Sequence, residues 1–168
     1  MGLEEHREPK QAGIGVTIIT VSDTRRGRED SGGGYLVEAL EEAQHEVHWR
    51  TWVPDERLSI KEALAKALSM PEVEVVLFTG GTGLAPRDVT SQVLQDAFEL
   101  AIPGFGELFR MLSYEEIGPA TILSRASAGV ILGRLICSLP GSPKALRLAM
   151  ERILLPELHH LVNQIQGR

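Results

Sequence analysis

The chain has 168 residues, of which 43% are hydrophobic and 24% are charged, a composition typical of one globular domain with an apolar core. Its formal net charge of −6 disfavours general binding to nucleic acid, but it leaves room for a local pocket that holds one small anion. Cys137 is the single cysteine, which excludes an intramolecular disulfide and a zinc site built from several thiolates.

The first twelve residues are rich in charge and lack the apolar core of a signal peptide. We expect residues 1–12 to form a flexible arm and residues 13–168 to form a single domain. No run of the sequence approaches the 18 apolar residues of a membrane span. We therefore expect a cytoplasmic protein that uses neither a membrane nor a nucleic acid as its partner.

Short apolar runs rich in β-branched residues alternate with segments of helical spacing. The runs predict strands over 15–22, 46–53 and 73–79, and a strand, a turn at Gly133 and a second strand within 129–140. The helical segments are 35–44, 58–70 up to Pro71, 92–100, 105–117 and 143–166, the last bent at Pro156, whereas 23–34 is rich in turns and 120–129 has no clear pattern.

This order, β-α-β-α-β-α-α-β-β-α, predicts a three-layer α/β/α domain with a mainly parallel sheet. Right-handed crossovers bring the carboxyl ends of parallel strands to one edge, where such sheets bind ligands. Four loops should meet there, because each follows a predicted strand: 22–34, 54–56, 78–90 and 139–145.

The third loop follows a buried strand and has the sequence FTGGTGLAPRDVT. Gly80, Gly81 and Gly83 can adopt positive φ and let a ligand approach the backbone closely, and the next helix begins with free N–H groups that suit an anion. The alternative is a plain tight turn. The loop matches neither a P-loop nor the dinucleotide fingerprint, since it lacks the P-loop lysine and has Pro86 where the third glycine belongs.

Two loop aspartates could hold a cation at this edge. Asp88 could instead cap the helix that follows it, although Thr90 or Ser91 could do the same. Ser59 and Glu62 fit a capping box, which would free Asp55 from capping. Two carboxylates beside an anion suit Mg²⁺. Asp23 and Asp30 could add negative charge, and Arg87 could reach a phosphate or carboxylate or simply pair with Asp88.

Other helix starts are predicted at the same edge. Ser142 and Pro143 fit the N-cap and first position of a helix, and Ser31 precedes a glycine run that could begin another. Several helix N-termini, glycine-lined backbone and two carboxylates together indicate a site for phosphoryl or nucleotidyl transfer, in which the protein positions groups and neutralises charge.

Six motifs in order carry a specific resemblance: TVSDT (20–24), DSGG (30–33), VPDE (53–56), TGGTGLAPRDVT (79–90), SRASAG (124–129) and LPGSPKA (139–145). On these the chain resembles the MoaB/Mog family of molybdenum cofactor biosynthesis. The resemblance implies a molybdopterin-binding fold, homotrimers or homohexamers, and transfer of adenylate from ATP to molybdopterin with Mg²⁺. The product would then pass to a molybdenum insertion protein. The alternative is a binding or carrier protein without catalysis.

The resemblance also assigns site residues. Asp55 and Asp88 match the essential carboxylates and would position Mg²⁺ and phosphate. The nucleotide and phosphate pocket would be lined by Thr79, Gly80, Gly81, Thr82, Gly83 and Arg87, the adenylate by Gly141 and Ser142, the pterin side by Ser22, Asp23, Thr24 and Ser31, and a further pocket loop by Ser124, Arg125, Ala128 and Gly129. The helix over 105–117 carries more apolar residues than one face needs, which suggests either core packing or a subunit interface.

Overall fold

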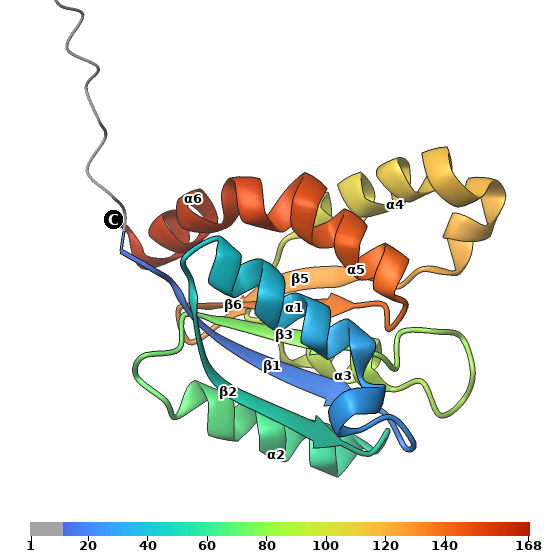
Figure 1. The fold of residues 1–168 in the computed structure, drawn as a ribbon, viewed down its shortest axis with the longest axis horizontal. Helices are drawn as coiled ribbons and strands as arrows, with labels where there is room; N and C mark the ends of the chain where they lie inside the picture. The colour runs from blue at the N-terminus through green and yellow to red at the C-terminus, as the bar shows by residue number, and fades with distance from the viewer. Residues whose placement is uncertain (1–11) are drawn as a thin grey trace, which may run out of the picture.

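The computed structural model describes residues 12–168, so nearly all of the predicted N-terminal arm lies outside the described residues. Its centre is a six-stranded sheet with helices on both faces, which confirms the three-layer α/β/α prediction (Figure 1). In the part of the chain that is described, no helix combines the length and apolarity needed to cross a bilayer.

The sheet has the strand order β2-β1-β3-β6-β5-β4 and is mainly parallel. Neighbours run parallel from β2 to β6, whereas β5 is antiparallel to β6 and the short β4 is antiparallel to β5. The strands are β1 (Gly15–Val21), β2 (Glu46–Val53), β3 (Val75–Thr79), β4 (Leu100–Ala101), β5 (Ser127–Ile131) and β6 (Arg134–Leu139).

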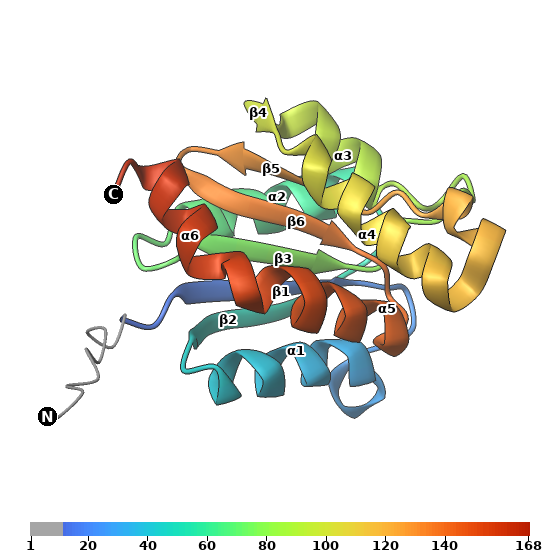
Figure 2. The ribbon, with the colours of Figure 1, turned by 90° about the horizontal axis from the view of Figure 1, so that it is seen from above.

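Helices cover the two faces of the sheet unequally (Figures 1 and 2). One face packs against α1 (Ser31–Glu42), α4 (Pro103–Ile117), α5 (Pro143–Ala149) and α6 (Leu155–Gln166), and the other against α2 (Arg57–Leu68) and α3 (Thr90–Ala97). Short 3₁₀ segments occupy Gly27–Glu29 and Gly118–Leu123, and a π-helical segment, Met150–Leu154, joins α5 to α6.

The central strand β1 explains why a continuous apolar run forms here. Successive side chains of a strand point to opposite faces. Val16 and Ile18 join the core under α1, α4, α5 and α6, while Ile19 and Val21 join the core under α2 and α3. Because both faces are covered, each position must be apolar or otherwise buried, which is the signature of a parallel central strand.

Several predicted boundaries were wrong. The first helix begins at Ser31 and not near Tyr35, because Asp30 caps it and the glycine run lies within its first turn. The capping box at Ser59 is absent: α2 begins at Arg57, with Glu56 in the N-cap position. The helix predicted over 92–100 begins earlier, at Thr90, and ends at Ala97, and Leu100 instead begins β4.

The C-terminal half follows the prediction more closely. The hairpin of β5 and β6 turns at Leu132 and Gly133, which have φ values of 47° and 70°, the pair of positive angles that a tight two-residue hairpin requires. The last helical region departs from α geometry at Met150, ahead of Pro156. A proline lacks the N–H that an α-helix would use, which is consistent with this change of hydrogen-bonding pattern.

Candidate active site

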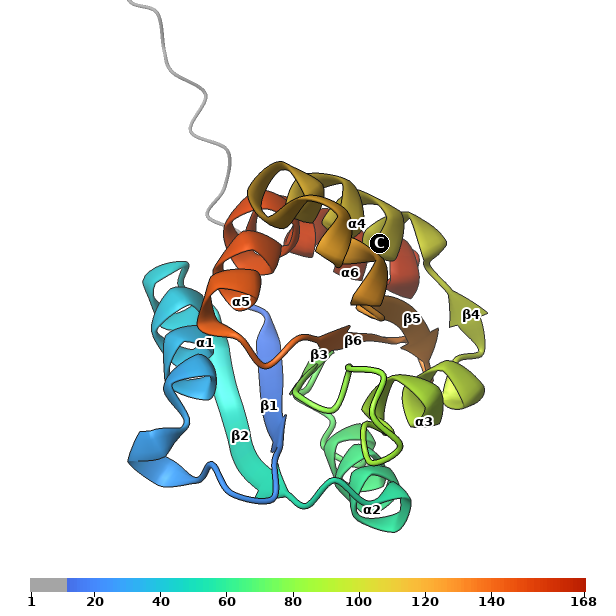
Figure 3. The same ribbon diagram turned by 90° about the vertical axis from the view of Figure 1, so that its right-hand side faces the viewer.

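Four loops meet at the carboxyl edge of the sheet, the edge that faces the reader in Figure 3. The strands end level with one another: Thr79 of β3 pairs with Thr20 of β1 and with Leu139 of β6. The strand that follows β1 in the chain, β2, lies on one side of β1, and the next strand, β3, lies on its other side. The strand order therefore reverses between β1 and β3. This is the switch point at which open α/β sheets bind ligands.

A cavity of about 300 Å³ opens at this switch point. It is formed by the loops after β1, β2, β3 and β6, and it includes both predicted catalytic aspartates. The predicted site residues that line it are Asp55, Asp88, Ser22, Asp23, Thr24, Ser31, Thr79, Gly80, Gly81, Thr82, Gly83, Arg87 and Gly141, and Thr20, Val21, Arg25, Asp30 and Gly32 complete the wall.

The glycine loop after β3 needs glycine at its first two positions. Gly80 and Gly81 have φ values of 96° and 66°, a region that side chains disfavour. A Cβ on Gly80 would also overlap the carbonyl oxygen of Val21 in β1. The N–H of Gly80 donates to the carbonyl oxygen of Leu139 over 3.0 Å. The loop is thereby held between β1 and β6 and turns towards the cavity.

Asp88 does not cap the following helix. The N-cap of α3 is Val89, whose own side chain makes no capping hydrogen bond, so none of the predicted caps Asp88, Thr90 and Ser91 occupies the N-cap position. The Asp88 Oδ2 atom instead accepts a hydrogen bond from the N–H of Ala85 over 3.1 Å, within the loop. Among residues 12–168, Asp88 and Arg87 form no ion pair with each other.

Asp55 lies between two other parts of the site. Its N–H donates to Asp23 Oδ1 over 3.0 Å, and its Oδ1 atom accepts from the N–H of Val89 over 3.4 Å. Burial raises the pKa of Asp55 above its ordinary value, and the nearby charges of Asp88 and Asp23 raise it further, against the opposing effects of the Val89 hydrogen bond and Arg87. The ionised form of Asp55 is therefore disfavoured in this site, and a bound cation would stabilise it.

The donor set fits Mg²⁺ bound together with a substrate. In the described chain, no group of three or more His, Cys, Asp or Glu side chains is arranged to hold a metal ion by itself. Asp55 and Asp88 face one cavity and offer carboxylate oxygens. Mg²⁺ commonly uses one or two carboxylates and completes its coordination with substrate phosphates and water. These two residues would hold it.

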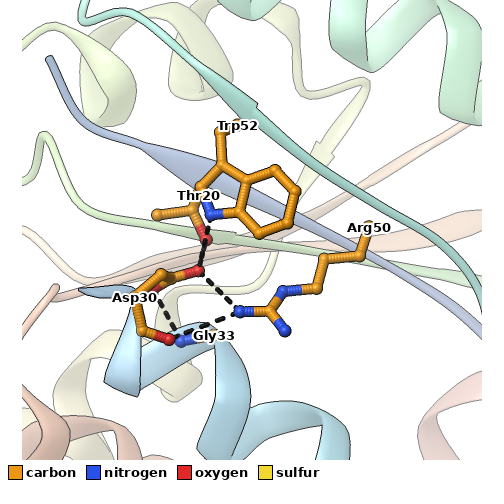
Figure 4. Close-up of polar contacts among 5 residues, drawn as sticks. All are labelled: Thr20, Asp30, Gly33, Arg50 and Trp52. Carbon is orange, nitrogen blue, oxygen red and sulfur yellow. Dashed lines mark hydrogen bonds and ion pairs between the residues drawn. The ribbon is translucent and has the colours of Figure 1, made fainter. Parts of the chain in front are cut away.

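Asp30 lines the cavity, and Figure 4 shows the residues that bind its carboxylate. Its side chain is 5% exposed and accepts hydrogen bonds from Thr20 Oγ1 over 2.7 Å, Gly33 N–H over 2.9 Å, Trp52 Nε1 over 2.9 Å and Arg50 Nη2 over 3.0 Å. Burial alone would raise the pKa of Asp30, but these donors outweigh burial and lower it. Asp30 is thus an ionised structural link between α1, β1 and β2.

The remaining predicted residues lie elsewhere. Ser142 caps α5, since its Oγ atom accepts from the N–H of Ala145 over 3.2 Å, which confirms the predicted helix start. Ser124, Arg125 and Ala128 line a second cavity, of about 460 Å³, beside α4. Gly129 is buried under the ring of Phe98. The structure therefore does not bring the side chains of 124–129 into the first cavity.

Comparison with known proteins identifies the family of this chain. The family described as "Probable molybdopterin binding domain" matches residues 17–160. A Bacillus subtilis protein named molybdenum cofactor biosynthesis protein B is 41% identical over 167 residues, which span 99% of this chain and 98% of that protein. The chain belongs to the MoaB/Mog family. The Escherichia coli K12 protein of the same name is 43% identical over 143 residues, covering 85% of this chain and 84% of that protein.

Solved structures agree with this assignment to the MoaB/Mog family. A crystal structure of molybdenum cofactor biosynthesis protein B is 42% identical, with a TM-score of 0.90 over 93% of this chain and 98% of that one. The tungsten cofactor synthesizing protein MoaB from Pyrococcus furiosus is 36% identical, with a TM-score of 0.85 over 95% of this chain and 99% of that one. The predicted MoaB/Mog-like fold is therefore confirmed.

Sequence reasoning misses the contacts that organise the site. Arg50 and Trp52 were predicted only as residues of a strand, and Thr20 only as part of a motif. None of the three was predicted to bind Asp30. One signal is available for Asp30: an aspartate directly before a small polar residue and a glycine run is a preferred N-cap. Thr90 is predicted only as a cap, yet it is fully buried, and its Oγ1 atom has no hydrogen-bond partner in the described residues.

Proposed function

We propose that this protein acts in molybdenum cofactor biosynthesis by adenylylating molybdopterin with ATP in a Mg²⁺-dependent reaction. The observation that carries this proposal is the pair Asp55 and Asp88 on one glycine-lined cavity at the switch point of the sheet. In the reaction, an oxygen of the molybdopterin phosphate attacks the α-phosphorus of ATP. A new P–O bond forms, the bond to the β-phosphate oxygen breaks, and pyrophosphate leaves.

The loops around the cavity divide the substrates between them in this proposal. The glycine loop from Thr79 to Gly83 would bind phosphate and nucleotide through backbone N–H groups, with Arg87 beside the phosphates. Bound Mg²⁺ would neutralise phosphate charge between Asp55 and Asp88. Gly141 and Ser142 would border the adenylate at the start of α5, and the pterin side would be formed by Ser22, Asp23, Thr24 and Ser31.

The direct test incubates the purified protein with molybdopterin and Mg·ATP and measures pyrophosphate and adenylylated molybdopterin. Both products are expected in equal amounts. Binding of molybdopterin without either product would refute catalysis and would favour the second candidate, a binding or carrier protein of the same pathway. Omission of Mg²⁺ with a chelator present should stop product formation without unfolding the protein.

Asp88→Asn is expected to keep the fold and to lower kcat by about 100-fold or more, because the substitution removes a negative charge from the reacting centre. The fold should survive because the asparagine oxygen can still accept the hydrogen bond from Ala85. Asp96→Asn, an exposed change on α3 outside the cavity, is the matched control and should keep full turnover. Unchanged turnover in Asp88→Asn would remove Asp88 from the mechanism.

The proposal also includes a homotrimer or homohexamer that hands its product to a molybdenum insertion protein. Phe105, Phe109 and Leu112 of α4 are buried, as core packing predicts, but Met111 and Ile117 on the same helix are 59% and 51% exposed. Such apolar exposure favours a protein contact. Size-exclusion chromatography with light scattering is expected to give three or six times the 18.4 kDa chain mass. A stable monomer would contradict this.

A further inference from the structure

Arg125 directs its guanidinium to the backbone of the glycine loop. Its Nε atom donates to the carbonyl oxygen of Thr82 over 3.4 Å. Its Nη2 atom donates to the carbonyl oxygens of Gly83 and Asp88 over 2.6 and 2.7 Å. These three carbonyls lie in the irregular segment between β3 and α3, which has no ladder of its own to fix its peptide groups. The side chain of Arg125 therefore supplies the hydrogen-bond donors that the backbone of a strand or helix would otherwise supply to these carbonyls.

The same contacts also determine the direction of the N–H groups of those three peptide units. In a trans peptide the N–H points away from the preceding C=O, and the described chain has no cis peptide bond. With the carbonyls of Thr82, Gly83 and Asp88 turned to Arg125, the N–H groups that follow them face away from Arg125. One of these, the N–H of Val89, donates to Asp55 Oδ1 over 3.4 Å.

A single peptide group thus connects Arg125 to Asp55. The Asp88–Val89 peptide accepts from Arg125 on its oxygen and donates to Asp55 from its nitrogen. The backbone of Arg125 is itself held in place, because its carbonyl oxygen accepts a hydrogen bond from Ser91 Oγ over 3.2 Å. Ser91 is fully buried and lies beside Ser138 of β6. Chains of such contacts hold site residues in one geometry.

We propose that Arg125 is a positioning residue: it fixes residues 82–89 and, through the Asp88–Val89 peptide, sets the relative placement of the carboxylates of Asp88 and Asp55. This differs from the direct substrate contact that the motif resemblance implies for Arg125. It also differs from a general charge effect, because two separate nitrogens of one planar guanidinium reach the three carbonyls, whereas the donors of an ammonium group all lie on a single nitrogen. The effect on turnover rests on the proposed function, whereas the effect on the loop does not.

The first test measures amide hydrogen exchange in the protein without any ligand. Arg125→Lys and Arg125→Ala should speed exchange over residues 82–89 by about 10-fold or more, with β3 amides unchanged. Arg110→Ala is the matched control, since Arg110 donates to the carbonyl of Ala126 in the same second cavity and does not reach the loop. Wild-type exchange over 82–89 in both Arg125 variants would overturn the proposal, whether or not the protein proves to be an adenylyltransferase.

The second test separates positioning from phosphate binding. Arg125→Lys should lower kcat by about 10- to 100-fold, with a smaller change in the KM for ATP, because the substitution displaces the loop and removes no group that touches ATP. Added methylguanidinium should restore part of the turnover of Arg125→Ala, while methylammonium should not. Full activity in Arg125→Lys, or equal rescue by the two cations, would show that charge alone matters and would refute positioning.

Discussion

Asp55→Asn is expected to lower turnover strongly and to raise thermal stability when Mg²⁺ is absent. The two effects have one cause. Asp55 is held partly out of water beside Asp88 and Asp23, and its pKa is raised, so its ionised form costs folding free energy at neutral pH. Asparagine removes that charge and keeps an oxygen for the N–H of Val89. Loss of the carboxylate from the reacting centre should lower kcat by about 100-fold or more.

The destabilising effect of the Asp55 carboxylate depends on pH. A folded-state pKa above the unfolded value of 3.8 means that the folded protein binds the proton more tightly than the unfolded chain does. The wild type therefore loses stability, relative to Asp55→Asn, as the pH rises from the unfolded pKa through the raised folded pKa, and the full difference persists at neutral pH. At pH values well below 3.8 the carboxyl is neutral in both states, and the difference should vanish.

Thermal unfolding of both proteins, followed from about pH 4 to about pH 8 in chelator, tests this. Asp96→Asn is the control, because that carboxylate lies outside the cavity. Addition of Mg·ATP should then stabilise the wild type more than Asp55→Asn, since a ligand of the folded state stabilises in proportion to its occupancy. A lower melting temperature for Asp55→Asn in chelator would show that Asp55 is structural and not a strained member of the site.

The contrast between the predicted and observed helix starts shows what local sequence can reveal. Glycine has poor helix propensity, so the run from Gly32 to Gly34 argues against a helix before Tyr35. Tertiary packing decides otherwise. A Cβ on Gly32 would come within 2.8 Å of Leu146 Cδ1 in α5, so glycine at this position allows α1 to approach α5 closely. The residue that Gly32 packs against is more than a hundred positions away in the chain, so the local sequence does not reveal this contact.

The edge of the sheet was predictable for a different reason. Continuous apolar strands identify a parallel sheet, and its topology gathers the loops after those strands. The aspartates of two separate loops, Asp55 and Asp88, could therefore be placed together from the sequence. The hydrogen-bonding partners could not. Whether Asp88 caps a helix, or Arg125 meets a phosphate or a carbonyl, depends on side-chain direction, which spacing does not determine.

Asp30→Ala is expected to be among the most destabilising single changes in the chain, with a loss of about 3–5 kcal/mol in the free energy of unfolding. The substitution removes the N-cap of α1 and leaves Thr20, Trp52 and the N–H of Gly33 without their acceptor. It also leaves the guanidinium of Arg50, whose side chain is 25% exposed, without its counter-ion. Chemical denaturation followed by circular dichroism measures the loss.

The pH dependence for Asp30 has the opposite sign to that for Asp55. The pKa of Asp30 is lowered below 3.8 by its hydrogen bonds. Its ionised form therefore stabilises the fold above pH 3.8, and this contribution is lost as the pH falls through the lowered folded-state pKa. Asp30→Asn, which cannot ionise, should be less stable than the wild type at neutral pH and should approach it in strong acid. A constant difference across this range would rule out the charge as the source.

A double variant separates the buried charge from the packing around it. Removing one member of a buried ion pair leaves an uncompensated charge, whereas replacing both members with apolar groups removes that penalty. Asp30→Ala combined with Arg50→Met should therefore be more stable than Asp30→Ala alone, although the cap of α1 is missing from both proteins. The difference between them measures the cost of an unpaired Arg50. If the double variant were instead the less stable, Arg50 would be stabilising the fold mainly through its contact with the ring of Trp52, 4.9 Å away, and not through Asp30.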